Sequence, residues 1–200
     1  DSQAENAGDD SLQKIKDKGQ LVLGLDDSFP PMGYRDDKDN IVGYDIDLAT
    51  EVCKRMGVEL KLEPITWAYN VDELNQGTVD CLWNGMSINE ERQEKLNLSE
   101  PYMENRQVVV TLKGNGIEKV ADLKDKVVVL QDGSTAMDAL DGREDIKSII
   151  KDGEAVRVPN NVLAMYELRQ KTSDAVIMDE VVARYYISHL TELEQDAKAE

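Results

Sequence analysis

Short apolar runs alternate with helical spacings of apolar residues along most of the chain. In the first half, the runs predict buried strands and the helical spacings between them predict two helices. These elements are strands at 21–25, 58–65 and 79–83 and helices at 45–57 and 71–76. Asp45 is the expected cap of the first helix, and Gly57 and Gly77 are the expected stops of the two helices. The strand–helix–strand–helix–strand order predicts a parallel α/β unit.

A second unit of the same kind follows a linking strand at 107–112. Its predicted elements are strands at 126–131, 155–158 and 174–178, a helix that begins after Asp132–Thr135, a helix capped by Asn161 and a helix opened by Asp179. The segments 76–83 and 170–177 share a pattern of a turn, an aspartate, a small residue and an apolar strand, which aligns Asp80 with Asp174. This local repetition supports two similar lobes.

Charge and length limit the classes of partner. The 200 residues include 23 basic and 41 acidic side chains, so the net charge is −18. Such a surface repels nucleic acids and anionic membranes. The apolar runs are all far shorter than the ~20 residues of a membrane helix. The length suits one large domain or two small lobes with a core that needs no disulfide.

The rare residues exclude several kinds of catalytic site. His189 is the only histidine, so zinc sites that need two histidines are absent. A catalytic triad would have to use His189, which lies in a polar stretch without a signature. Cys53 and Cys81 are too far apart for CxxC spacing. The sequence leaves open whether they are two buried thiols or a disulfide.

Two polar segments are predicted to be structural or flexible rather than chemical. Residues 36–40 (DDKDN) lack the glycine and the glutamate of a calcium loop, which favours a solvated turn. Residues 1–10 contain four acidic residues, no basic residue and nothing apolar larger than alanine. This composition predicts a disordered tether, of the kind left after a targeting segment is removed.

Polar residues follow the predicted strands at the ends where parallel α/β sheets bind ligands. They are Asp26–Phe29, Trp67, Asn84–Ser87 and Arg92 in the first unit, and Gln131–Thr135, Asn160–Asn161 and Asp179 in the second. The Arg92 guanidinium suits a carboxylate, the helix start at Gly133–Thr135 suits an anion, and Asp179 suits a cation. Alone, the helix start could be an ordinary cap and Arg92 a surface charge. Together they predict a site for a zwitterion with two close charges, an α-amino acid.

Several motifs in order resemble the polar amino-acid family of bacterial extracytoplasmic solute-binding proteins, the receptors of ABC importers. They are 26–31 (DDSFPP), 43–49 (GYDIDLA), 84–92 (NGMSINEER), 99–102 (SEPY), 122–124 (DLK), 131–135 (QDGST) and 179–180 (DE), and the match runs from about residue 20 to 188. The resemblance implies a type II periplasmic-binding-protein-like fold, with two Rossmann-like α/β lobes around a ligand cleft. The expected division is an acidic lead-in at 1–19, a first lobe at 20–107 and a second lobe at 108–200.

The resemblance also implies roles for individual residues. Arg92 would bind the ligand α-carboxylate with help from Ser87 and Thr135, and Asp179 with the Gly85 carbonyl would bind the α-ammonium. Phe29 and Trp67 would form the walls of the side-chain pocket, although apolar residues in a loop can also be core. The full implied ligand-binding set is Asp26, Phe29, Trp67, Asn84, Gly85, Ser87, Arg92, Gln131, Ser134, Thr135 and Asp179. Acidic residues Asp26 and Asp27 beside two aromatics favour a polar or cationic side chain such as Arg, Lys, His or Gln, with cystine fitting almost as well.

The implied function is the binding component of an amino-acid importer, which closes two lobes around a polar L-α-amino acid and then docks on a membrane permease. No catalysis, metal or cofactor is implied. The expected location is extracytoplasmic, in the periplasm or on the cell surface as a lipid-anchored protein. One alternative is an enzyme of the same fold, such as a cyclohexadienyl dehydratase, which needs a general acid where Asp179 fits an amine clamp. Another is the sensor domain of a membrane receptor.

One departure from the family concerns the end of the sequence. The family normally continues with a strand that crosses back to the first lobe and a final helix, whereas this sequence stops at Glu200 in an acidic, helix-prone stretch. We therefore expect the second hinge strand to be missing, or to be supplied by a partner chain through strand exchange.

Overall fold

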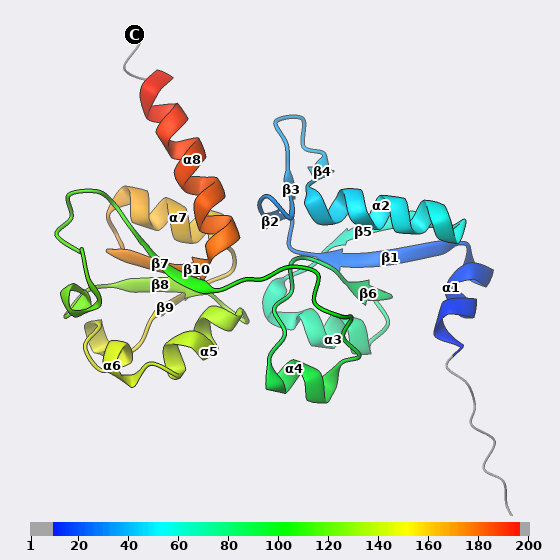
Figure 1. Ribbon diagram of the computed structural model, residues 1–200, viewed down its shortest axis with the longest axis horizontal. Coiled ribbons are helices and arrows are strands. Elements are labelled where there is room, and N and C mark those ends of the chain that lie inside the picture. Colours follow the sequence, from blue (N-terminus) through cyan, green and yellow to red (C-terminus); the bar gives the residue numbers. More distant parts are fainter. Residues whose placement is uncertain (1–9, 197–200) are drawn as a thin grey trace, which may run out of the picture.

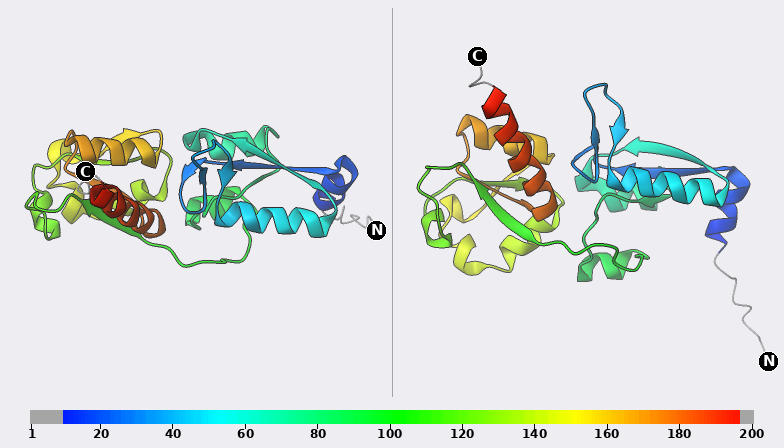
Figure 2. Two further views of the ribbon diagram at one scale, coloured as in Figure 1. Left: turned by 90° about the horizontal axis from the view of Figure 1, so that it is seen from above. Right: turned by 45° about the horizontal axis from the view of Figure 1, so that its top comes forward.

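The computed structural model describes residues 10–196 and consists of two α/β lobes that lie side by side (Figure 1). A chain segment before strand β7 runs from the first lobe to the second, as Figure 2 shows from two further directions. The expected fold class, two α/β lobes, is therefore confirmed.

Lobe 1 contains a parallel sheet and a small antiparallel sheet. The parallel sheet has the order β5–β1–β6, and the antiparallel sheet has the order β2–β3–β4. The strands are β1 (Gln20–Leu25), β2 (Ser28–Phe29), β3 (Gly33–Arg35), β4 (Ile41–Val42), β5 (Glu59–Pro64) and β6 (Cys81–Leu82). The helices are α1 (Ser11–Lys18), α2 (Tyr44–Met56), α3 (Asn70–Asn75) and α4 (Glu90–Lys95), with a 3₁₀ turn at Trp67–Tyr69.

Lobe 2 contains one mixed sheet of the order β7–β10–β8–β9, in which β7 is antiparallel to β10 and the other pairs are parallel. The strands are β7 (Gln107–Thr111), β8 (Val128–Gln131), β9 (Val156–Val158) and β10 (Ala175–Asp179). The helices are α5 (Thr135–Asp141), α6 (Glu144–Lys147), α7 (Asn161–Gln170) and α8 (Glu180–Asp196), with 3₁₀ turns at Val120–Leu123 and Lys151–Gly153.

The apolar runs of lobe 2 form strands because both faces of the sheet are buried. Val128 and Leu130 of β8 pack in one core cluster, whereas Val129 between them packs in another. β10 alternates in the same way, with Ile177 in one cluster and Val176 in the other. A sheet that is covered on both faces needs continuous apolar strands rather than an alternation with polar residues.

The repeated sequence pattern corresponds to a repeated structure. In lobe 1, the Asp80 carboxylate accepts the backbone N–H of Val22 at 2.7 Å, and the Asp80 N–H donates to the Val22 carbonyl at 2.8 Å. In lobe 2, Asp174 makes the same two bonds with Val127, both at 2.8 Å. Each aspartate therefore joins a strand to its parallel neighbour in its own lobe, and the two lobes are similar, as predicted.

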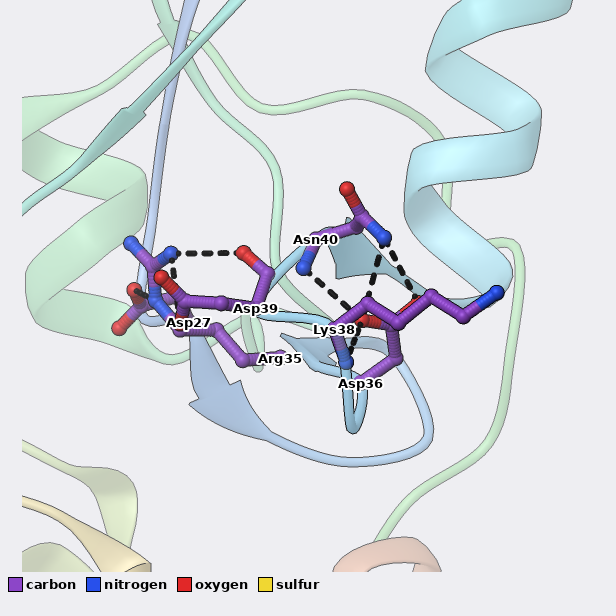
Figure 3. A network of polar contacts seen from close by, with 6 residues as sticks. All are labelled: Asp27, Arg35, Asp36, Lys38, Asp39 and Asn40. Atoms are coloured by element: carbon purple, nitrogen blue, oxygen red, sulfur yellow. Dashed lines mark hydrogen bonds and ion pairs between the residues drawn. The ribbon is translucent and has the colours of Figure 1, made fainter.

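The turn predicted at 36–40 is confirmed (Figure 3). It joins β3 to β4, and the Asp36 carboxylate accepts the backbone N–H groups of Lys38 at 2.8 Å and Asn40 at 2.9 Å. These bonds hold the pKa of Asp36 below its usual value. The acidic side chain therefore stabilises the turn, which is a structural role.

Two of the expected helix caps are wrong by one residue or more. Helix α2 begins at Tyr44 after Gly43, which has a φ of 138°, and Asp45 is fully buried and accepts a hydrogen bond from the Tyr102 hydroxyl instead. Helix α7 is capped by Asn160, whose side chain accepts the N–H of Leu163. Both aspartate and asparagine favour caps locally, and tertiary contacts decided which residue became the cap.

The predicted strand boundaries differ from the structure by one or two residues, and two of these differences concern residues near the candidate site. The strand expected at 79–83 is reduced to Cys81–Leu82 in β6, which has one neighbouring strand among residues 10–196. Asp179 is the last residue of β10 rather than the first residue of the following helix. Cys81 is partly buried and not bonded to Cys53, so both cysteines are free thiols.

Most of the expected tether lies outside the described residues, as do residues 197–200 of the acidic C-terminal stretch. The later part of the lead-in forms helix α1, and α8 carries the acidic stretch as helix as far as Asp196. Between residues 10 and 196, every helix is too short or too polar to cross a membrane.

Candidate functional site

A small cavity of about 20 Å³ lies between the lobes. Its walls combine β2, the 3₁₀ turn after β5, the loop after β6 and helix α4 of lobe 1 with the ends of β8 and β10 and the start of α5 of lobe 2. The lining residues are Phe29, Trp67, Asn84, Gly85, Met86, Ser87, Arg92, Gln131, Ser134, Thr135 and Asp179. All the expected ligand-binding residues except Asp26 are therefore brought together, and Met86 is added.

Arg92 is held rigidly on the lobe 1 side of this cavity. Asn89 caps helix α4 by accepting the backbone N–H of Arg92 at 2.8 Å, which fixes the start of the helix. The guanidinium donates to the Ser87 carbonyl at 2.8 Å and to the Gly133 carbonyl of lobe 2 at 3.4 Å, and lies 5.9 Å from the centre of the Trp67 ring. Its burial lowers the pKa of the Arg92 guanidinium. The other N–H groups of the guanidinium are available for an anion.

Asp179 occupies the lobe 2 side at the end of β10. Its carboxylate accepts hydrogen bonds from the side-chain amides of Asn105 and, at 2.9 Å, Gln107. Gln107 also donates to the Thr135 hydroxyl at 3.1 Å, which links Asp179 to the first turn of α5. Burial raises the pKa of Asp179, whereas the two amides and the charge of Arg92 lower it.

No pattern in the sequence indicates that Asn105 and Gln107 support Asp179. They lie more than 70 positions earlier, and the antiparallel pairing of β7 with β10 places Gln107 opposite Asp179. Only the register of these two strands brings the groups together.

A second supporting network fixes the backbone at Gly85. The Gly85 N–H donates to the Tyr102 hydroxyl at 3.2 Å, and this hydroxyl donates to buried Asp45 at 2.9 Å. Gly85 has a φ of 60°, and a Cβ there would lie 3.3 Å from the Phe29 ring and from Met32. Burial raises the pKa of the Asp45 carboxyl. The Gly85 carbonyl is thus presented by a backbone that few other residues could adopt.

The loop before α5 differs from the expected anion site. The Gly133 N–H contacts the sulfur of Met137 at 3.3 Å, and the Ser134 hydroxyl donates to the Gln131 carbonyl at 2.7 Å. These groups, which were expected to be free, are therefore engaged within the turn. Gly133 has a φ of 70°, and a Cβ there would lie 2.7 Å from Cα of Ala68 in lobe 1. At Gly133 the loop therefore makes a close contact between the lobes, while Ser134 and Thr135 line the cavity.

Asp26 lies behind the cavity wall in a chain of buried polar groups. Its carboxylate accepts the N–H of Ser28 at 2.9 Å, the Ser28 hydroxyl, and the amide of Gln131 from lobe 2 at 2.6 Å. The Gln131 oxygen accepts from Asn161 at 3.0 Å. Burial raises the pKa of Asp26, against these hydrogen bonds. This chain joins the two lobes directly.

A larger cavity of about 500 Å³ lies beside β6 and contains neither Arg92 nor Asp179. Residues 81–88 form one side and residues 97–103 with Asn105 form the other. It shares only Asn84–Ser87 with the cavity between the lobes. The opposite charges converge in the smaller cavity, which is the candidate site.

Comparison with known proteins places these features in a family. Residues 21–189 match the family described as bacterial extracellular solute-binding proteins, family 3. The chain is 30% identical over 175 residues to the L-cystine-binding protein TcyJ of Escherichia coli K12, covering 86% of this chain and 63% of that protein. It is 29% identical over 200 residues to the arginine-binding extracellular protein ArtP of Bacillus subtilis, covering 98% of this chain and 74% of that protein. The chain thus spans less than two thirds of the cystine-binding relative.

Solved structures show the same architecture. An ABC uptake transporter substrate-binding protein of Streptococcus pneumoniae with bound histidine superimposes with a TM-score of 0.88 and 33% identity, covering 92% of this chain and 75% of that one. The arginine-binding protein of Thermotoga maritima in its holo form gives a TM-score of 0.79 and 33% identity, covering 90% of this chain and 77% of that one.

Proposed function

Because the chain belongs to family 3 of the bacterial extracellular solute-binding proteins, we propose that it binds a polar L-α-amino acid between its lobes as the binding component of an ABC importer. The strongest support is that Arg92 of lobe 1 and Asp179 of lobe 2 line the same cavity. Buried opposite charges in a cavity suit a ligand that carries both charges itself, because each buried charge then gains a partner.

In this proposal, the free N–H groups of Arg92 bind the ligand α-carboxylate, with the hydroxyls of Ser87 and Thr135 as further donors. Asp179 and the Gly85 carbonyl accept hydrogen bonds from the α-ammonium. Each charged end of the ligand would contact both lobes, with its main charged partner Arg92 on lobe 1 or Asp179 on lobe 2, so the ligand bridges the lobes. Ligand binding therefore favours the closed arrangement of the lobes.

Phe29 and Trp67 form the apolar walls of the proposed pocket. Both side chains are 7% exposed and line the cavity. Phe29 also packs in the same apolar cluster as lobe 2 residues such as Met165 and Met178. Closure therefore buries apolar surface as well as the ligand, which contributes to the free energy of closing.

We further infer that the closed, loaded protein docks on a membrane permease outside the cytoplasm. The family description and the relatives named as binding proteins support this part of the proposal. In such a system the permease moves the ligand, and the binding protein performs no catalysis.

A thermal-shift screen over the protein amino acids and cystine tests the proposal. Ligand at about a hundredfold above its dissociation constant stabilises a folded protein by about 2.7 kcal/mol. An unchanged ligand recovered from the complex agrees with simple binding, whereas a chemically altered product would indicate the dehydratase-like alternative. Stabilisation by none of these compounds would contradict the proposal.

The Arg92→Ala variant should lose amino-acid binding by about thirtyfold or more while remaining folded, because truncating one partner of a buried ion pair costs roughly 2–5 kcal/mol of binding. Lys95→Ala on the same helix is the control, since Lys95 is exposed and pairs with Glu91. Isothermal titration calorimetry measures affinity, and circular dichroism checks folding. Unchanged affinity in the Arg92→Ala variant would refute the proposed carboxylate clamp.

A further inference from the structure

The cavity wall carries one positive and one negative side chain, so its charges cancel without a contribution from the side chain of the ligand. Among residues 10–196, the charged side chains that line the cavity are Arg92 and Asp179, one positive and one negative. The proposed function, on which this inference rests, uses both for the charged ends of the amino-acid backbone. We propose that the site selects an amino acid whose side chain carries no net charge.

Asp26, the expected partner of a cationic side chain, is already satisfied and lies off the wall. One carboxylate oxygen accepts both donors of Ser28, and the other accepts the Gln131 amide at 2.6 Å. The second N–H of that amide donates to the Pro159 carbonyl at 3.2 Å, and its oxygen accepts from Asn161. A ligand cation that took the place of the Gln131 amide at Asp26 would break a buried hydrogen bond between the lobes.

Asp27 is equally unavailable to a ligand in the cavity. Its carboxylate pairs with the Arg35 side chain at 2.6 Å, and Arg35 also pairs with Asp39 at 3.2 Å (Figure 3). This cluster lies at the β3–β4 hairpin and contributes no residue to the cavity wall. The two adjacent aspartates, which in the sequence favoured a cationic ligand, are thus both engaged within the protein: Asp26 by neutral hydrogen-bond donors and Asp27 by the Arg35 cation.

Burial explains why this charge balance should select the ligand. Arg92 and Asp179 are only 8% and 5% exposed, so a charged ligand side chain enclosed beside them would lose its hydration and find no further opposite charge on the cavity wall. An uncharged polar side chain loses much less hydration free energy and can make ordinary hydrogen bonds. The loss of hydration therefore weakens the binding of ligands with cationic and with anionic side chains.

Two pairs of ligands with similar shapes test the inference by isothermal titration calorimetry at neutral pH. L-Citrulline carries a neutral urea where L-arginine carries a guanidinium, and L-glutamine carries an amide where L-glutamate carries a carboxylate. In each pair, we expect the neutral ligand to bind about tenfold or more tightly. Tighter binding of arginine than citrulline, or of glutamate than glutamine, would overturn the inference. So would a protein amino acid with a charged side chain as the best ligand. Binding of no amino acid would instead contradict the proposed function itself.

An Asp26→Asn variant separates a structural role of Asp26 from a role as ligand counter-charge, and Asp27→Asn is its matched neighbour. We expect the ratio of citrulline to arginine affinity to stay within about threefold of the wild type in both variants. A selective loss of arginine binding by about tenfold in Asp26→Asn alone would show that Asp26 pairs with the ligand and would refute the inference. Thermal unfolding of each variant verifies that it is folded.

Discussion

The two lobes use the same local device in different surroundings. Asp80 in lobe 1 and Asp174 in lobe 2 each accept the backbone N–H of a residue at the neighbouring parallel strand. The strand that follows differs greatly. In lobe 1, β6 is two residues long and partly buried, whereas in lobe 2 all five residues of β10 are buried.

The number of strands that pair with β6 and with β10 explains this difference in length and burial. β10 pairs with β8 and also with β7, over five residues from Ala175 to Asp179. Within the part of the chain that the structure describes, β6 pairs only with β1, and the 500 Å³ cavity flanks it. A shared sequence pattern therefore determined the local hydrogen bonds, and the presence of a second neighbouring strand determined strand length and burial.

Two glycines with similar φ values give the largest expected difference in ligand affinity between matched variants of the two lobes. Gly77 in lobe 1 and Gly133 in lobe 2 have φ values of 74° and 70°, but a Cβ meets nothing within 4 Å at Gly77 and lies 2.7 Å from Ala68 Cα at Gly133. Overpacking of this kind costs roughly 1–3 kcal/mol. The Gly133→Ala variant should therefore bind the ligand about ten- to a hundredfold more weakly. Calorimetric titration of the best ligand from the screen measures this loss.

The Gly77→Ala variant is the control for backbone strain. It should cost about 1 kcal/mol of stability or more, because a positive φ is unfavourable for alanine, while ligand affinity stays unchanged. Equal affinity losses in the two variants would mean that the lobes do not close as the structure shows.

Removing the shared aspartate from each lobe gives the next largest effect. Asp174→Ala and Asp80→Ala should each destabilise the protein by about 1–3 kcal/mol, because each leaves a backbone N–H without its acceptor. We expect the larger loss for Asp174, since its strand lies deeper in a core. Urea unfolding measures both losses.

Native-state hydrogen exchange assigns each of these losses to a lobe. In the wild type, amides of β10 should exchange much more slowly than those of β6, because the better buried strand opens at higher free energy. Asp174→Ala should accelerate exchange in lobe 2 and leave β6 unchanged. Equal protection of β6 and β10 in the wild type would contradict the comparison.

The smallest expected effect concerns an ion pair at the start of β7. Glu180, which is partly buried, pairs with Arg106 and Arg184, and these pairs lower the pKa of Glu180 from 4.5 to about 2. Because the folded pKa lies below the unfolded value, this stabilisation is present above about pH 4.5 and is lost as the pH falls towards about 2. Glu180→Gln should therefore melt slightly lower than the wild type at neutral pH.

Melting curves at several pH values between neutral and about pH 3 measure this effect. The difference between Glu180→Gln and the wild type should shrink as the pH falls. A constant difference would show that the pair does not contribute through its charge. Glu144→Gln is a suitable control, since no ion pair involves Glu144 among the salt bridges of the described residues.

Much of the architecture could be predicted from local patterns. The order of strands and helices, the stop of α2 at Gly57 and the turn at 36–40 depend on neighbouring residues, so periodicity and turn chemistry predict them. The motifs that led to Arg92 and Asp179 also needed no three-dimensional information. Both side chains follow from the rule that ligands bind at the carboxyl ends of parallel strands.

Tertiary structure decided which polar groups are free and which are used. The sequence shows Asp26 and Asp27 as adjacent acids, but Gln131 lies 105 positions from Asp26, and only the contact between lobes brings the two together. Likewise, Gln107 supports Asp179 because of strand register, and Tyr102 supports Gly85 through a fold-dependent contact. Hydrogen bonds between distant residues depend on atomic positions that local preferences do not specify. The sequence by itself therefore determined the elements and the candidate charges, and the packing of the lobes determined the charge that a ligand would meet.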